Sequence, residues 1–214
     1  MRRARPGLVL ALVAGAWLGL ADRAGYAEPS RFEVDAQASR VVIHVGKSGV
    51  FGFAGHEHEV VAPAVRGSVT ADAAQLARSS VEVTFDAAAL RVTGAGEPAK
   101  DVPDVQKTML GPECLDAASF PTIRFESRAV TDAGAEPGGR RVAIHGALTL
   151  HGVTRAITLP ARVALDRDTV EATGTFVVRQ TDFGIKPISK AGVVNVKDEL
   201  DVRWRLVARR SHRG

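Results

Sequence analysis

The regular alternation of apolar and polar residues in the second half of the chain constrains its fold more than any other sequence feature. Within 141–150, one side of the alternation carries Val142, Ile144, Leu148 and Leu150, and the other carries Ala143, His145 and Thr149. A period of two is typical of a strand with one buried face and one solvated face. Several such strands predict an antiparallel sheet that curls around an apolar interior.

The same alternation recurs along most of the chain. It is sustained for about ten residues in each of three later segments, 156–166, 169–179 and 196–209. Further strands are predicted at 31–35, 40–45, 56–62, 64–71, 79–86, 122–131 and 140–150. We interpret these ten segments as about eight strands, with turn sequences at Gly138-Gly139 and at 166–168.

One segment departs from this pattern and predicts a short helix over 101–110. Val102, Val105 and Met109 approximate helical spacing there. Asp101 is a candidate N-cap and Pro103 lies in the predicted first turn. The chain therefore has one or two short helices beside its strands, too few to cover a large sheet.

Long strands that lack helices to cover them favour a closed barrel, because closure removes exposed strand edges. Strands of ten residues span roughly 30 Å at the usual rise per residue. A barrel of that length is more than a self-filled core needs, and it suits an extended apolar ligand. We therefore predict an all-β fold, an extended eight-stranded antiparallel β-barrel in a single domain.

The N-terminus has the pattern of an export signal. A basic segment, 1–5, precedes an uncharged and mostly apolar run of about 14 residues, and Gly25 and Ala27 fit the −3 and −1 positions of a cleavage site. The apolar run is shorter than the roughly 20 residues that a spanning helix needs. We expect residues 1–27 to be a signal peptide and 28–214 to form a periplasmic domain; an uncleaved N-terminal anchor is the alternative.

Charge and cysteine content exclude several partners. Removing the four arginines and one aspartate of 1–27 from 28 basic and 24 acidic residues leaves 24 against 23, a net charge near +1. Nucleic-acid binding is not expected, because it needs a concentrated basic face. The arginines after 202 are read first as a solvated strand face, with transient contact to a membrane surface as the alternative. The single cysteine, Cys114, rules out an internal disulfide and is read as a small buried apolar residue.

His56-Glu-His58 is the sharpest polar motif. Residues two apart in a strand point the same way, so the two imidazoles could share a metal ion, with His145 or His151 as further ligands. A lone pair of histidines is a weak signal, since zinc sites need three or four ligands. No nucleophile elbow, phosphate loop or paired carboxylates are present, so we expect neither an enzyme nor a cofactor.

Several motifs together resemble the YceI-like family in order and spacing. The most specific are Phe120-Pro-Thr-Ile-Arg-Phe125 and Gly146-Ala-Leu-Thr-Leu-His-Gly-Val-Thr-Arg155; weaker ones lie at 32–35, 182–185 and 196–200. The resemblance covers about 31–209. It implies a lipocalin-like barrel that binds an isoprenoid chain, such as a polyprenyl or quinone tail, in its bore. It also implies an exported bacterial protein outside the enzyme classes.

The candidate ligand-binding residues follow from the alternation. They are Phe51, Phe53, Val83, Phe85, Ile123, Phe125, Leu148, Leu150, Phe176 and Trp204. The sequence thus favours an exported carrier of an isoprenoid or other long-chain amphiphilic lipid. The alternatives are a metal-binding or redox-stress protein that uses His56 and His58, and a self-packed barrel that serves as an interaction module. The sequence leaves the oligomeric state open, with a homodimer as one alternative.

Overall fold

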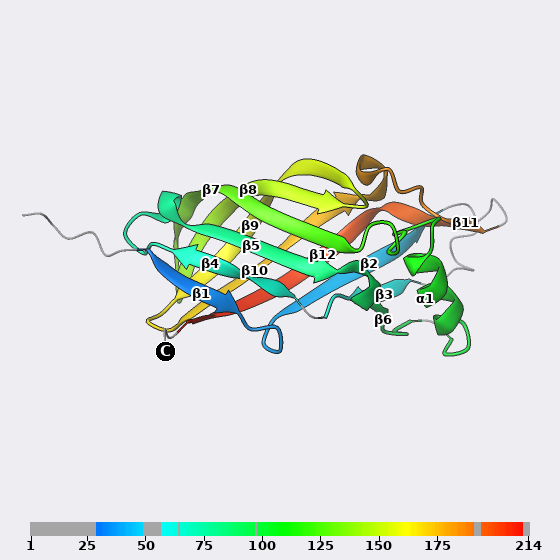
Figure 1. Ribbon diagram of the computed structural model, residues 1–214, viewed down its shortest axis with the longest axis horizontal. Coiled ribbons are helices and arrows are strands. Elements are labelled where there is room, and N and C mark those ends of the chain that lie inside the picture. Colours follow the sequence, from blue (N-terminus) through cyan, green and yellow to red (C-terminus); the bar gives the residue numbers. More distant parts are fainter. Residues whose placement is uncertain (1–28, 49–56, 64, 97, 191–193, 212–214) are drawn as a thin grey trace, which may run out of the picture.

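The computed structural model describes residues 29–48, 57–63, 65–96, 98–190 and 194–211, and its strands dominate (Figure 1). The strands are β1 (Ser30–Val34), β2 (Arg40–Ser48), β3 (His58–Val61), β4 (Arg66–Ala71), β5 (Ser80–Asp86), β6 (Arg91–Val92), β7 (Thr122–Glu136), β8 (Gly139–Leu150), β9 (Val153–Leu165), β10 (Thr169–Arg179), β11 (Ser189–Lys190) and β12 (Val194–Arg210). Within these described residues the helices are α1 (Val102–Leu110) and the 3-10 turns η2 (Leu76–Arg78), η3 (Ala87–Ala89) and η4 (Gln180–Phe183).

Eight strands close into a ring. Their order is β1-β4-β5-β7-β8-β9-β10-β12, and β12 pairs back onto β1. Every neighbouring pair in this ring is antiparallel. The closing pairs place Phe32 opposite Arg210 and Val34 opposite Ala208. This ring confirms the predicted eight-stranded antiparallel barrel.

The long strand β12 pairs along one edge with two different strands, β1 and β2. Its C-terminal part pairs with β1, whereas its residues from Asn195 to Arg205 pair with β2. Beyond β2 the sheet continues through β3 to β6. In Figure 1, β1 and the C-terminal end of the chain therefore lie at one end of the barrel, and β3, β6 and α1 lie at the other.

Helix α1 covers the β3–β6 end. Val102, Val105 and Met109 of α1 pack against a buried cluster that includes Val60 and Val92. The helix predicted over 101–110 is thus confirmed, and Asp101 occupies the predicted N-cap position. Asp101 already has helical dihedral angles, and its side chain makes no capping hydrogen bond. Its backbone carbonyl instead accepts a bond from the Val105 N–H.

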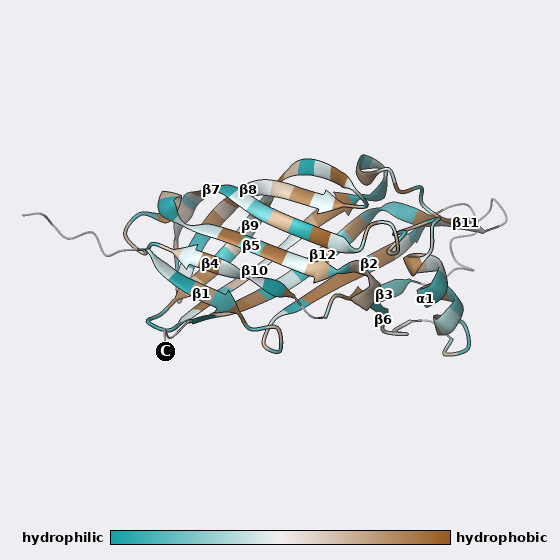
Figure 2. Ribbon diagram, viewed as in Figure 1, coloured by the Kyte–Doolittle hydropathy of each residue, from teal (hydrophilic) through white to brown (hydrophobic). Residues whose placement is uncertain are grey.

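The barrel wall follows the predicted alternation closely. Apolar and polar residues alternate along β5, β7 and β8 in Figure 2, and the buried faces of β8 and β10 carry residues such as Ile144, Leu148 and Ala172. Strand β7 extends to Glu136, beyond the predicted end at Thr131. The alternation did not predict this length, because register shifts after Ser127 and Asp132 interrupt its period of two. Within the described residues, no helix has the length and apolar character required to cross a membrane.

Candidate functional site

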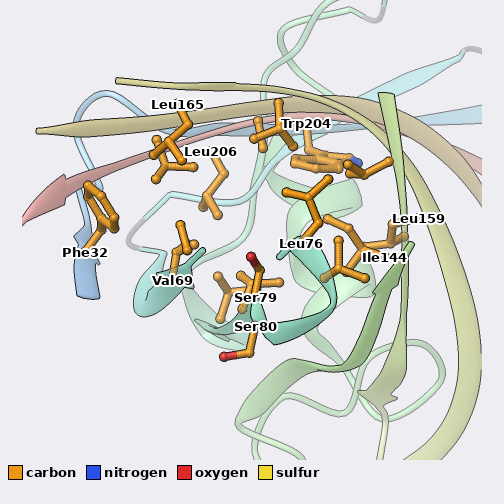
Figure 3. Close-up of a pocket in the computed structure, with 18 of the residues that line it drawn as sticks. Phe32, Val69, Leu76, Ser79, Ser80, Ile144, Leu159, Leu165, Trp204 and Leu206 are labelled. Atoms are coloured by element: carbon orange, nitrogen blue, oxygen red, sulfur yellow. The ribbon is translucent and has the colours of Figure 1, made fainter. Parts of the chain in front are cut away.

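The barrel encloses an apolar cavity of about 660 Å³, a size found among small-molecule binding sites. Inward-facing side chains from every strand of the ring contribute to its wall, and Figure 3 shows several of them converging on the same space. The apolar part of the wall comprises Phe32, Val41, Val69, Val81, Val83, Phe85, Phe125, Val130, Val142, Ile144, Leu148, Leu159, Val163, Val170, Ala172, Phe176, Val202, Trp204 and Leu206.

Two glycines shape this wall by giving room to aromatic rings. A Cβ at Gly146 would lie 2.6 Å from Cζ of Phe125, on the neighbouring strand β7. Gly174 makes the same kind of room for Trp204. Because the rings lie against the backbone of the next strand, the centre of the barrel is left unfilled. The Trp204 Nε1–H is buried and has no hydrogen-bond partner among the described residues, so one unpaired donor lies in this otherwise apolar wall.

Most of the predicted lining residues that the structure describes contribute to the cavity. These are Val83, Phe85, Phe125, Leu148, Phe176 and Trp204. Ile123 and Leu150 face inward but pack against the core at the α1 end and do not line the cavity. Phe51 and Phe53 lie outside the described residues.

The sequence interpretation missed two groups of lining residues. The first is aliphatic and includes Ile144, Leu159 and Leu206, whose positions in the alternation already marked them as inward-facing. The second is polar and lies where β1, β4, β5, β8, β9 and β12 begin or end. It comprises Ser30, Asp72, Ser79, Ser80, Arg140, Asp166 and Arg167, together with Arg210. These residues gather from distant parts of the chain, so no local motif marks them.

The polar residues form the mouth of the cavity, at the end opposite α1. Arg210 is fixed there by several contacts: its Nε donates to the Arg167 carbonyl (2.7 Å) and lies 3.5 Å from Asp168 Oδ1, and its Nη1 donates to Ser30 Oγ (3.0 Å). Its guanidinium also lies 5.2 Å from the Phe32 ring centre. The mouth is therefore a defined polar rim on an apolar bore.

The histidines do not form a metal centre within the described part of the chain. His56 lies outside it, and no group of three or more potential ligands is found among the residues inside it. His145 lies between Thr131 Oγ1 (3.2 Å) and Thr158 Oγ1 (3.0 Å), and His151 Nδ1 lies 3.2 Å from the Phe183 carbonyl. Both imidazoles thus lie within hydrogen-bond distance of neighbouring threonine or carbonyl oxygens. The prediction that His56 binds a metal ion is not tested.

A second hollow of about 480 Å³ lies at the end away from the mouth and includes Cys114, His151 and Ile188 in its lining. Cys114 is half-buried, and burial raises the pKa of its thiol. A raised pKa disfavours the thiolate, which is the reactive form. This hollow therefore lacks the activated nucleophile that a catalytic cysteine would need.

Fold and site together define a closed β-barrel with a ligand-sized apolar bore and a polar mouth, and sequence comparison places this barrel in a family. Residues 32–208 match the YceI-like domain, so the chain belongs to the YceI-like family. No curated protein sequence gives a significant match.

Solved structures with the same fold are distant in sequence. BcnA from Burkholderia cenocepacia is 22% identical, with 82% of this chain and 99% of that chain covered at a TM-score of 0.65. A polyisoprenoid binding domain from Saccharophagus degradans is 13% identical, with 84% and 98% covered at 0.60. The YCEI protein of Campylobacter jejuni is 14% identical, with 72% and 85% covered at 0.56. At these identities the likeness supports the fold.

Proposed function

We propose that this protein binds an amphiphilic isoprenoid lipid, of the polyprenyl or quinone type, inside its barrel and sequesters or carries it. The observation that carries the proposal is the unfilled apolar cavity of about 660 Å³ inside the closed ring of strands. The related domain from Saccharophagus degradans, described as polyisoprenoid binding, supports the same ligand class.

The cavity wall explains how such a ligand would be held. Each methylene that moves from water to an apolar wall contributes roughly 0.8 kcal/mol before the cost of ordering the chain. Branched isoprenoid tails fill the bore by van der Waals contact with residues such as Leu148, Phe176 and Leu206. The tail supplies affinity and the polar mouth contacts the head group. This role requires binding and release, with no reaction catalysed.

The leader-like sequence of 1–27 supports a periplasmic site for this proposed activity. A water-soluble carrier is useful there, because long isoprenoid tails partition strongly into membranes and need a shielded bore to leave them. The proposed site of action follows from the sequence of the leader.

Native mass spectrometry of the protein purified from a periplasmic fraction tests this proposal, followed by organic extraction of the bound material. A co-purified species of isoprenoid mass supports the carrier function and identifies its cargo. A bare protein that stays bare after incubation with quinones and polyprenols contradicts it. Adducts of zinc or copper mass, lost in a His56→Ala/His58→Ala variant that retains lipid binding, reveal a separate metal site.

A further inference from the structure

At the cavity mouth, the carboxylates have partners within the fold, whereas the arginines keep unused hydrogen-bond donors. The two carboxylates that line the mouth are already used by the local backbone. Asp166 Oδ1 accepts from the N–H groups of Asp168 (2.9 Å) and Thr169 (2.7 Å), which closes the β9–β10 turn. Asp72 Oδ1 accepts from the Ala74 (3.0 Å) and Gln75 (2.8 Å) N–H groups.

The second oxygen of Asp72 is buried but is also accounted for. It has no hydrogen-bond partner in strict geometry, yet the Arg78 Nε lies 3.4 Å away and forms an ion pair with it. The ion pair is the more relevant description, because a carboxylate this deeply buried needs a counter-charge. The acidic groups of the mouth thus have their partners within the fold.

The arginines of the mouth keep unused donors. A guanidinium carries five N–H groups in a planar fork. Arg210 uses its Nε and Nη1 on Arg167 and Ser30 and has Asp168 at 3.5 Å. Arg140 pairs with Asp132. Arg167 lies at the tip of the β9–β10 turn, and its guanidinium has no partner among the residues that the structure describes.

The remaining arginine in the cavity lining, Arg205, uses its donors on other residues of the protein. Its Nε and Nη2 bind both carboxylate oxygens of Glu171 at 2.8 and 2.9 Å, and its Nη1 binds the Ala38 carbonyl. Arg205 therefore stabilises the outer wall. The donors available to a ligand come from Arg140, Arg167 and Arg210.

We infer that this mouth selects ligands with an anionic head group, a phosphate or a carboxylate, which Arg167 binds together with Arg140 and Arg210. The inference rests on the proposed function, since it assumes an apolar tail in the bore. Guanidinium groups match phosphate and carboxylate oxygens through paired N–H bonds, whereas a neutral alcohol or quinone head leaves most of these donors without charged acceptors.

Three probes with one tail test the inference: geranylgeranyl phosphate, geranylgeranoic acid and geranylgeraniol. Trp204 lines the cavity, so a change in its fluorescence reports binding. The only other tryptophan is Trp17, which the expected cleavage after Ala27 removes. We expect one or both anionic probes to bind about 10-fold more tightly than the alcohol, which is the difference that one charge-assisted hydrogen bond supplies.

Arg167→Gln should reduce this preference to within about 3-fold, because it weakens binding of the anionic probes more than binding of the alcohol. Arg203→Gln is the matched control, because Arg203 is an exposed residue of β12 that does not line the cavity. The stronger anionic probe tells phosphate from carboxylate as the natural head group. Equal affinities for all three probes, or a preference that survives Arg167→Gln, overturn the inference but leave the carrier function standing. Binding of none of them overturns both.

Discussion

The indole of Trp204 lies directly over Gly174, its partner on the neighbouring strand β10. A Cβ at Gly174 would lie 2.8 Å from Cζ2 of Trp204 and 2.4 Å from the Pro160 carbonyl oxygen. Three strands thus approach closely at one point of the wall. Gly174 also forms the last pair between β10 and β9, and Pro160, which lacks an N–H, is the next residue of β9.

Gly174→Ala should destabilise the barrel by about 1–3 kcal/mol, because the added methyl group forces the wall apart where a carbonyl oxygen cannot move independently. Urea unfolding measures the change in midpoint. Gly46→Ala is the control, since its nearest contact, at 2.9 Å, is Cδ of Lys197, part of a flexible side chain. Equal midpoints for the two variants would contradict the packing described for Gly174.

Filling the bore should remove ligand binding and preserve the fold. Ala172 is buried on β10 and lines the cavity. A phenylalanine there occupies space that the ligand tail needs, so Ala172→Phe should weaken binding of an isoprenoid probe by at least about 10-fold. The cavity has room for the ring, so the free energy of unfolding should change by less than about 1.5 kcal/mol.

Ala156→Phe provides the comparison for the filled bore. Ala156 lies exposed on β9 and does not line the cavity. Its variant should bind the probe as the unchanged protein does, measured by the same fluorescence titration. If both phenylalanine variants retain full affinity, the ligand occupies some other part of the molecule.

The contact between η4 and β12 should make stability depend on pH. Thr181 donates to Asp198 from its hydroxyl (2.7 Å) and its backbone N–H (2.9 Å), and these bonds hold the pKa of Asp198 below its ordinary value of 3.8. A carboxyl with a lowered pKa stabilises the fold above its unfolded pKa, and the contribution is lost as the pH falls through the folded pKa.

Thr181→Val removes the hydroxyl bond, so it should lower stability at pH 7, and the difference from the unchanged protein should shrink below about pH 4. Thermal unfolding across pH 3–7 measures this. Thr175→Val, at an exposed position of β10, serves as the control and should show a difference that does not vary with pH. A Thr181→Val difference that is constant down to pH 3 would refute the role of Asp198.

The sequence predicted the barrel because a wall with one dry and one wet face imposes a period of two on each strand. That period identified the inward positions of Leu148, Phe176 and Trp204 correctly. It does not report which strands pair over long distances. The sharing of the β12 edge by β1 and β2 depends on contacts between the two ends of the chain, and no local pattern encodes it.

The mouth was missed for a related reason. Arg167 and Arg210 are joined by a hydrogen bond between residues 43 positions apart, and each alone reads as a charged residue in a turn or a tail. The roles of Gly146 and Gly174 could not be predicted either, because a glycine in a strand indicates a close approach but not which side chain approaches it. Composition and period predict a bore, whereas its shape and polarity come from tertiary contacts.

Cys114 should react slowly with iodoacetamide in the folded protein. Burial raises the pKa of its thiol above the ordinary value of 9.0, which reduces the thiolate fraction at pH 8. We expect alkylation at pH 8 to be slower than for N-acetylcysteine, to accelerate in urea, and to keep rising with pH above 9. A loaded bore should not alter the rate, because Cys114 lines the separate hollow near His151. Alkylation as fast as that of the free thiol would show that the 112–114 segment leaves the thiol open to solvent, and protection by a bore ligand would show that the hollow and the cavity are coupled.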